Sequence, residues 1–140
     1  MKIILVLSVV LFQISASAAS YICGGVSSTR NRKEVQLIID QEKNSVMLNQ
    51  LVVSGGMPPY PYVNVENWAI TEDNSTGDSI FISGITIRPT TGTIGRIGIQ
   101  GTRLNGPGRN IYNFEAKVKP ASNRVIPVVI ETIEGTCKVR

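Results

Sequence analysis

Two cysteines, Cys23 and Cys137, constrain the fold of this chain more than any other feature of its sequence. They are its only cysteines, and they lie near opposite ends of the segment that follows an apolar N-terminal stretch. An even number of cysteines in a small exported domain favours a disulfide. A bond closing a loop of roughly 115 residues stabilises a fold by about 4–5 kcal/mol, because it restricts the unfolded chain. We therefore predict a disulfide between the first and last strands of one domain.

Residues 1–18 have the features of a signal peptide. Lys2 supplies a positive charge, and residues 3–14 form an apolar run that is too short to span a bilayer comfortably. Ala16-Ser17-Ala18 then fits the A-x-A cleavage pattern. We expect an exported protein, periplasmic or secreted, whose residues 19–140 form a single β domain without a membrane-spanning segment.

The remainder of the chain consists of strand-sized segments separated by turn residues. In the clearest of them, Tyr112, Phe114, Ala116 and Val118 alternate with polar residues, as in a strand with one buried face. The predicted strands cover residues 21–23, 35–40, 46–53, 63–71, 80–87, 93–100, 111–118 and 128–139. About eight short strands at regular spacing predict an all-β, antiparallel, up-and-down barrel, with a Greek-key β-sandwich as the alternative. A disulfide between first and last strands suits closure, because it joins two edges that would otherwise be open.

Composition excludes several functional classes. The sequence has no histidine, so it lacks the usual Ser-His-Asp and Cys-His catalytic sets and the common zinc ligand sets. We therefore expect no enzymatic activity, no metal and no cofactor. The formal net charge is +4, and loss of Lys2 lowers it to about +3, which is too small to indicate a nucleic-acid partner.

The segment Met57-Pro58-Pro59-Tyr60-Pro61-Tyr62 is the first candidate for recognition. Prolines stiffen a loop, and a stiff loop loses less entropy when it binds. Exposed tyrosines offer the large amphipathic contact area found in binding hot spots. Tyr60 and Tyr62 are therefore candidate partner-binding residues, although the two rings could instead fold back over the barrel mouth.

A second candidate is a group of arginines in a stretch without acidic residues, Ser79 to Phe114. The group consists of Arg88, Arg96, Arg103 and Arg109. Arginines that share one face could bind an anionic partner, such as a phosphate-bearing glycolipid or an acidic protein surface. The alternative is that these residues simply occupy outward-facing strand positions.

Two further patterns are more simply structural. Glycines recur every third residue at Gly92, Gly95, Gly98 and Gly101, which predicts a strongly bent strand or close backbone approach. Residues 73–78 are rich in side-chain oxygens, but their spacing does not match a calcium loop. We expect a polar hairpin turn at residues 73–78.

The layout of the chain resembles a family of small periplasmic barrels, the membrane-bound or periplasmic inhibitors of C-type lysozymes. The resemblance lies in the export signal, Tyr21-Ile22-Cys23-Gly24-Gly25 at the start of the domain, and the lone partner Cys137 near its end. It implies a non-catalytic barrel that plugs an enzyme cleft with a loop. The family's Ser-Gly-x-x-Tyr loop is not matched, because residues 54–60 are longer and contain two prolines, and Thr76 precedes Gly77 where the family has lysine. No inhibitory residue is carried over, and an uncharacterised barrel family of similar shape stays an alternative.

Three functions remain open at this point. The first is a non-catalytic barrel that binds a protein partner through loop 57–62, with inhibition of that partner as one outcome. The second is a carrier that holds a small apolar or anionic ligand in the barrel mouth, which requires a cavity that side chains leave unfilled. The third is a structural role in the cell envelope.

Overall fold

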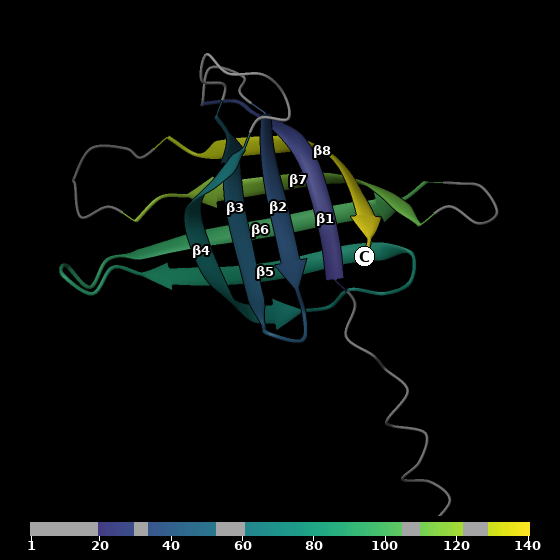
Figure 1. The fold of residues 1–140 in the computed structure, drawn as a ribbon. Coiled ribbons are helices and arrows are strands. Elements are labelled where there is room, and N and C mark those ends of the chain that lie inside the picture. The colour runs from purple at the N-terminus through teal and green to yellow at the C-terminus, as the bar shows by residue number, and fades with distance from the viewer. Residues whose placement is uncertain (1–19, 30–33, 53–60, 105–109, 122–128) are drawn as a thin grey trace, which may run out of the picture.

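A computed structural model describes residues 20–29, 34–52, 61–104, 110–121 and 129–140 (Figure 1). In these ranges the chain forms eight strands: β1 (Ser20–Ser27), β2 (Glu34–Asp40), β3 (Ser45–Leu51), β4 (Tyr62–Asp73), β5 (Ser79–Ile87), β6 (Ile94–Arg103), β7 (Ile111–Lys119) and β8 (Glu131–Val139). No helix in the described ranges is long and apolar enough to cross a membrane. Residues 1–18, the predicted signal peptide, lie outside the described part of the chain.

The strands form a closed antiparallel barrel in sequence order, and β8 pairs with β1 to complete it. The up-and-down barrel is therefore confirmed over the Greek-key sandwich. In Figure 1 the strands β1–β4 run across β5–β8, so that the barrel is flattened into two crossed halves. The predicted disulfide is present, because Cys23 of β1 is bonded to Cys137 of β8, its direct register partner.

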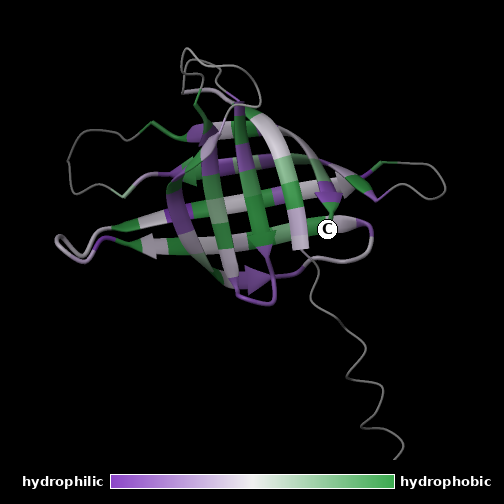
Figure 2. Ribbon diagram, in the orientation of Figure 1, coloured by the Kyte–Doolittle hydropathy of each residue, from purple (hydrophilic) through white to green (hydrophobic). Residues whose placement is uncertain are grey.

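The barrel interior is a packed apolar core. Along most strands, hydrophobic side chains alternate with polar ones, and Figure 2 shows this as alternating bands. The core is built mainly from Ile, Val and Leu, together with Trp68, the largest fully buried side chain. Tyr21 meets Tyr112 edge to face at 5.6 Å between ring centroids, and the Tyr112 hydroxyl donates to the Gly77 carbonyl at 2.7 Å.

The contact between β1 and β8, which closes the barrel, is unusually tight. Gly25 and Gly135 are direct register partners. A Cβ atom on Gly135 would collide with the carbonyl oxygen of Gly24, and one on Gly25 would collide with that of Glu134. Glycine is therefore required at this contact. The strand β1 continues through Gly24 and Gly25 to Ser27, whereas the sequence predicted that it ends at residue 23.

Strand β4 bends the barrel from one half into the other. The register with β3 passes from Asn64 to Glu66 and that with β5 passes from Ile70 to Glu72, so Val65 and Thr71 are extra residues without direct partners. Such bulges bend a strand and increase its twist. Pairing with β5 begins only at Ala69, so among the eight described strands the first half of β4 pairs with β3 alone.

An up-and-down barrel places alternate connections at opposite ends. We call the end where β1, β3, β5 and β7 finish the distal end, and the end that holds Ser20 and Arg140 the terminal end. In Figure 1 the distal ends of β1–β4 lie toward the top and those of β5–β8 toward the left. At the terminal end, the polar turn expected at residues 73–78 connects β4 to β5, although Asp73 is still the last residue of β4; the Asn74 amide donates to the Phe81 carbonyl at 2.9 Å.

Candidate functional site at the distal end

The distal end concentrates exposed apolar side chains. Single exposed hydrophobic residues are common on protein surfaces, whereas a group of them indicates an interaction site. The exposed large hydrophobic residues at the distal end are Val26, Val52, Tyr62, Val63, Val65, Ile87, Ile94, Val129 and Ile130. Elsewhere in the described ranges, such residues are limited to Phe81 and Val139.

The first half of β4 exposes apolar residues on both of its faces. Neighbouring residues of a strand point to opposite sides, yet Tyr62 is 40% and Val63 50% exposed. Both are exposed because this part of β4 pairs, among the described strands, only with β3 and extends beyond the core. The first residue of β4 that belongs to the core is Trp68. Val65, the bulged residue, is 44% exposed.

The hairpin of β5 and β6 exposes a second apolar pair. Ile87 and Ile94 are direct register partners, and both are largely exposed. The turn between them is closed by the Arg88 amide, which donates to the Thr93 carbonyl at 3.0 Å. Gly92 in this turn has φ of 67°, a left-handed conformation that favours glycine. The glycine series thus begins in a turn and continues into β6.

Tyr62 marks the base of the predicted recognition loop. The Val52 amide donates to the Pro61 carbonyl at 2.9 Å, which joins the two sides of the loop where β3 and β4 meet. Slight burial raises the pKa of the Tyr62 hydroxyl, and the nearby Glu34 carboxylate raises it further. Tyr62 is therefore a neutral hydrogen-bonding group at ordinary pH. Residues 57–60, including Tyr60, lie outside the described part of the chain.

The structure does not bring the three described candidate arginines to one place. Arg88 lies in the turn between β5 and β6, and Arg96 points outward from the start of β6. Arg103 ends β6, seven residues beyond Arg96, which corresponds to roughly 23 Å along a strand. Arg109 lies outside the described residues. Arg103 therefore stands at the terminal end, away from Arg88 and Arg96.

A buried polar pair joins β1 to β8 beneath the distal surface. Ser27 is fully buried, and its hydroxyl donates to the carboxylate of Glu131, which is also buried. Buried polar groups require such partners, so this pair contributes to the closure of the barrel at that end. Within the described ranges, no group of three or more His, Cys, Asp and Glu side chains is placed to hold a metal ion.

The loop and its tyrosines were identifiable from the sequence, but the surrounding apolar surface was not. In the predicted strand 63–71, Trp68 and Ile70 have the spacing of two residues on one face. Val63 and Val65 would lie on the opposite face of a regular strand. This switch of the hydrophobic residues from one face to the other was the available signal for a bulge. The exposure of Ile87 and Ile94 has no such signal, because it depends on how far their hairpin extends beyond the barrel.

Comparison of the chain with protein-family models, with curated proteins and with solved structures finds no match in any of the three. The disulfide is consistent with an oxidising compartment outside the cytosol.

Proposed function

We propose that this protein is an exported, non-catalytic binding module that holds a protein partner through the distal end of its barrel. The group of exposed apolar side chains at that end, with Tyr62 at the base of loop 57–62, is the observation that carries the proposal. The periplasm or the extracellular space is the proposed location, in agreement with the disulfide. An enzyme whose cleft accepts the loop is one class of partner, in which case binding would inhibit it.

The chemistry of the distal end suits a protein surface. Its exposed valine and isoleucine side chains supply apolar area, and burying such area on binding contributes roughly 25 cal/mol per Å² before the costs of association. Tyr62 adds a ring with a neutral hydroxyl, a combination enriched where binding energy concentrates. The arms β3–β4 and β5–β6 both extend beyond the core, so a partner could reach the apolar side chains of either arm without entering the barrel.

A carrier function has less support. A carrier leaves interior space for its ligand, whereas here Leu37, Ile39, Leu48 and Trp68 are among the large side chains that occupy the interior with at most 2% exposure. An anionic ligand would need converging cations, and Arg88, Arg96 and Arg103 do not converge. These observations favour recognition on the outside of the barrel.

The proposal is tested by site-specific photo-crosslinking in the compartment to which the protein is exported. A photoreactive amino acid replaces Tyr62 in one variant and Val139 in a matched control. The two positions have nearly equal exposure, 40% and 38%, but lie at opposite ends of the barrel. We expect a discrete protein adduct from position 62 and none from position 139.

A second pair of variants measures the contribution of the apolar side chains. Tyr62→Ser combined with Val63→Ser should weaken capture of that adduct partner at least about tenfold, whereas Val139→Ser should leave it unchanged. All of these residues are exposed, so the variants should remain folded. Equal adducts from both positions, or capture that survives the double substitution, would show that the distal end is not the binding surface.

A further inference from the structure

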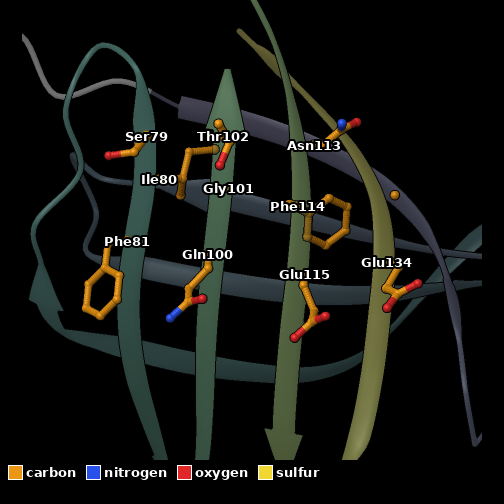
Figure 3. A pocket seen from close by; sticks show the side chains of 11 residues that line it. Ser79, Ile80, Phe81, Gln100, Gly101, Thr102, Asn113, Phe114, Glu115 and Glu134 are labelled. Carbon is orange, nitrogen blue, oxygen red and sulfur yellow. The ribbon is translucent and has the colours of Figure 1, made fainter. Parts of the chain in front are cut away.

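The outer wall of β5–β8 carries a groove that is separate from the distal end. Phe81, Gln100, Glu115 and Glu134 are consecutive register partners across these four strands. Figure 3 shows their side chains side by side on the outer surface. Together with the neighbouring row formed by Ser79, Thr102 and Asn113, they line an open hollow of about 740 Å³.

A glycine extends this hollow along the sheet. Gly98 faces outward from β6, between Ser83 of β5 and Lys117 of β7, and a Cβ atom added to it would meet nothing within 4 Å. A second hollow of about 230 Å³ lies over Gly98 and shares Phe81, Gln100 and Glu115 with the first. The two hollows therefore form one groove with Phe81 on its side.

The backbone of Phe81 is hydrogen-bonded on both sides, while its ring is exposed. Its amide donates to the Ser75 hydroxyl at 3.0 Å, and its carbonyl accepts from the Asn74 amide at 2.9 Å. The ring is 40% exposed, while its strand neighbours Ile80 and Ile82 are buried in the core. An aromatic ring whose backbone is fixed in a sheet offers an apolar platform that a ligand can cover without reorganising the strand.

The polar groups around this ring have unused hydrogen-bonding capacity. Within the described part of the chain, the side chains of Gln100, Asn113 and Glu134 make no hydrogen bond or ion pair. Glu115 lies 3.7 Å from Lys117, so this pair is close to neutral, and Glu134 directly opposes Glu115 across the strands. Like charges in that arrangement destabilise a sheet unless donors approach them. An anionic ligand would add to the repulsion.

We propose that this groove binds a neutral oligosaccharide. The C–H face of a sugar ring is apolar and can cover the Phe81 ring. Sugar hydroxyls both donate and accept, so they match the carboxylate of Glu134, which accepts, and the amides of Gln100 and Asn113, which do both. The groove is open and crosses several strands, a shape that suits an extended chain of sugar rings better than an enclosed small molecule. This site is independent of the distal end.

The test is an NMR titration of the oxidised, ¹⁵N-labelled protein with three neutral tetrasaccharides. The probes are the α-linked and β-linked glucose tetramers and the β-linked N-acetylglucosamine tetramer, each at millimolar concentration. We expect at least one probe to shift the amide resonances of Phe81, Gln100 and Glu115 in a saturable manner. The same titration with tetralysine tests a cationic ligand.

Three variants separate the groove from the rest of the barrel. Phe81→Ala removes the ring and should weaken binding about tenfold or more. Gly98→Val places a side chain in the hollow, where its Cβ atom would meet nothing within 4 Å, and should also weaken binding. Ile94→Ala removes a comparably exposed apolar residue at the distal end and should leave binding unchanged.

Two results would overturn the inference. One is the absence of saturable shifts with all three tetrasaccharides, including the case in which tetralysine alone shifts these amides, because the groove would then bind cations. The other is saccharide binding that persists in both Phe81→Ala and Gly98→Val, because the ligand would then lie elsewhere. Partner crosslinking from position 62 should be unaffected by either variant, so failure here and failure at the distal end are distinguishable.

Discussion

The barrel contains two junctions that complete it in different ways. Between β1 and β8 the register is unbroken from Tyr21 to Ser27, the backbones meet at Gly25 and Gly135, and a disulfide joins the strands. Between β4 and β5 the register is short and interrupted at Thr71. The β1–β8 junction secures closure, whereas the β4–β5 junction lets the first half of β4 extend outward. The loose junction thereby supplies part of the apolar surface that we assign to partner binding.

Removing the disulfide should produce the largest loss of stability. The double variant Cys23→Ala, Cys137→Ala releases a loop with a sequence separation of 114 residues. We expect the free energy of unfolding, measured by urea denaturation, to fall by about 4 kcal/mol, mainly because the unfolded chain gains freedom. A loss below about 1 kcal/mol would show that the glycine contact and the hydrogen bonds already secure this junction.

Filling the glycine contact should have the next largest effect. Gly135→Val places side-chain atoms against the carbonyl of Gly24, and we expect a loss of about 3 kcal/mol or more in urea denaturation. Gly98→Val is the matched control, because its new side chain enters open space on the outer wall. Its effect should stay within about 0.5 kcal/mol. Similar losses for both variants would contradict the special tightness of β1–β8.

Hydrogen exchange compares the two junctions in the unmodified protein. Amides of β1 and β8 that are bonded across their junction should exchange only through global unfolding. Amides of Tyr62–Asn67 should exchange roughly a hundredfold faster, a difference of about 2.7 kcal/mol, because they lack register partners on β5. Equal protection by NMR-detected exchange would show that β4 and β5 open together with the rest of the barrel.

The smallest expected effect is a loss of stability at alkaline pH. Burial raises the pKa of Tyr21 above its ordinary value of 10.0, and Tyr112 and Asp73 raise it further. The neutral hydroxyl is therefore favoured in the folded state. Its contribution to the free energy of unfolding is complete below pH 10 and is lost as pH rises through the higher folded-state pKa. In urea denaturation, Tyr21→Phe should reduce the loss of unfolding free energy above pH 10. Tyr62→Phe should not, because water screens that exposed ring.

Much of the fold was predictable, because alternation is a local signal. The buried positions Tyr112, Phe114, Ala116 and Val118 follow directly from the period of two in β7. The disulfide was predictable because there are only two cysteines. Closure of the barrel was predictable only through the two cysteines, since β1 and β8 are more than a hundred residues apart and no local strand pattern shows that their edges pair.

The candidate sites were less predictable, because they depend on geometry that one strand does not specify. The sequence identified Tyr62 but gave no sign that Val63 would be exposed beside it. The glycine series was interpreted as a bend or a close approach. Gly95 and Gly101 do approach neighbouring backbone, whereas Gly98 instead opens a hollow on the outer wall. Only the cross-strand register reveals that Gly98 lies beside Phe81 and Lys117.

The two described ends of the polypeptide meet on the side of the barrel away from the proposed partner surface. The Arg140 amide donates to the Ser20 carbonyl at 2.8 Å, and both residues lie at the terminal end. A tether, label or fused domain attached at either residue would therefore leave the distal arms unobstructed. Immobilised on a solid support through Arg140, the barrel would present Tyr62 outward in every copy, which makes the protein suited to use as an oriented capture reagent.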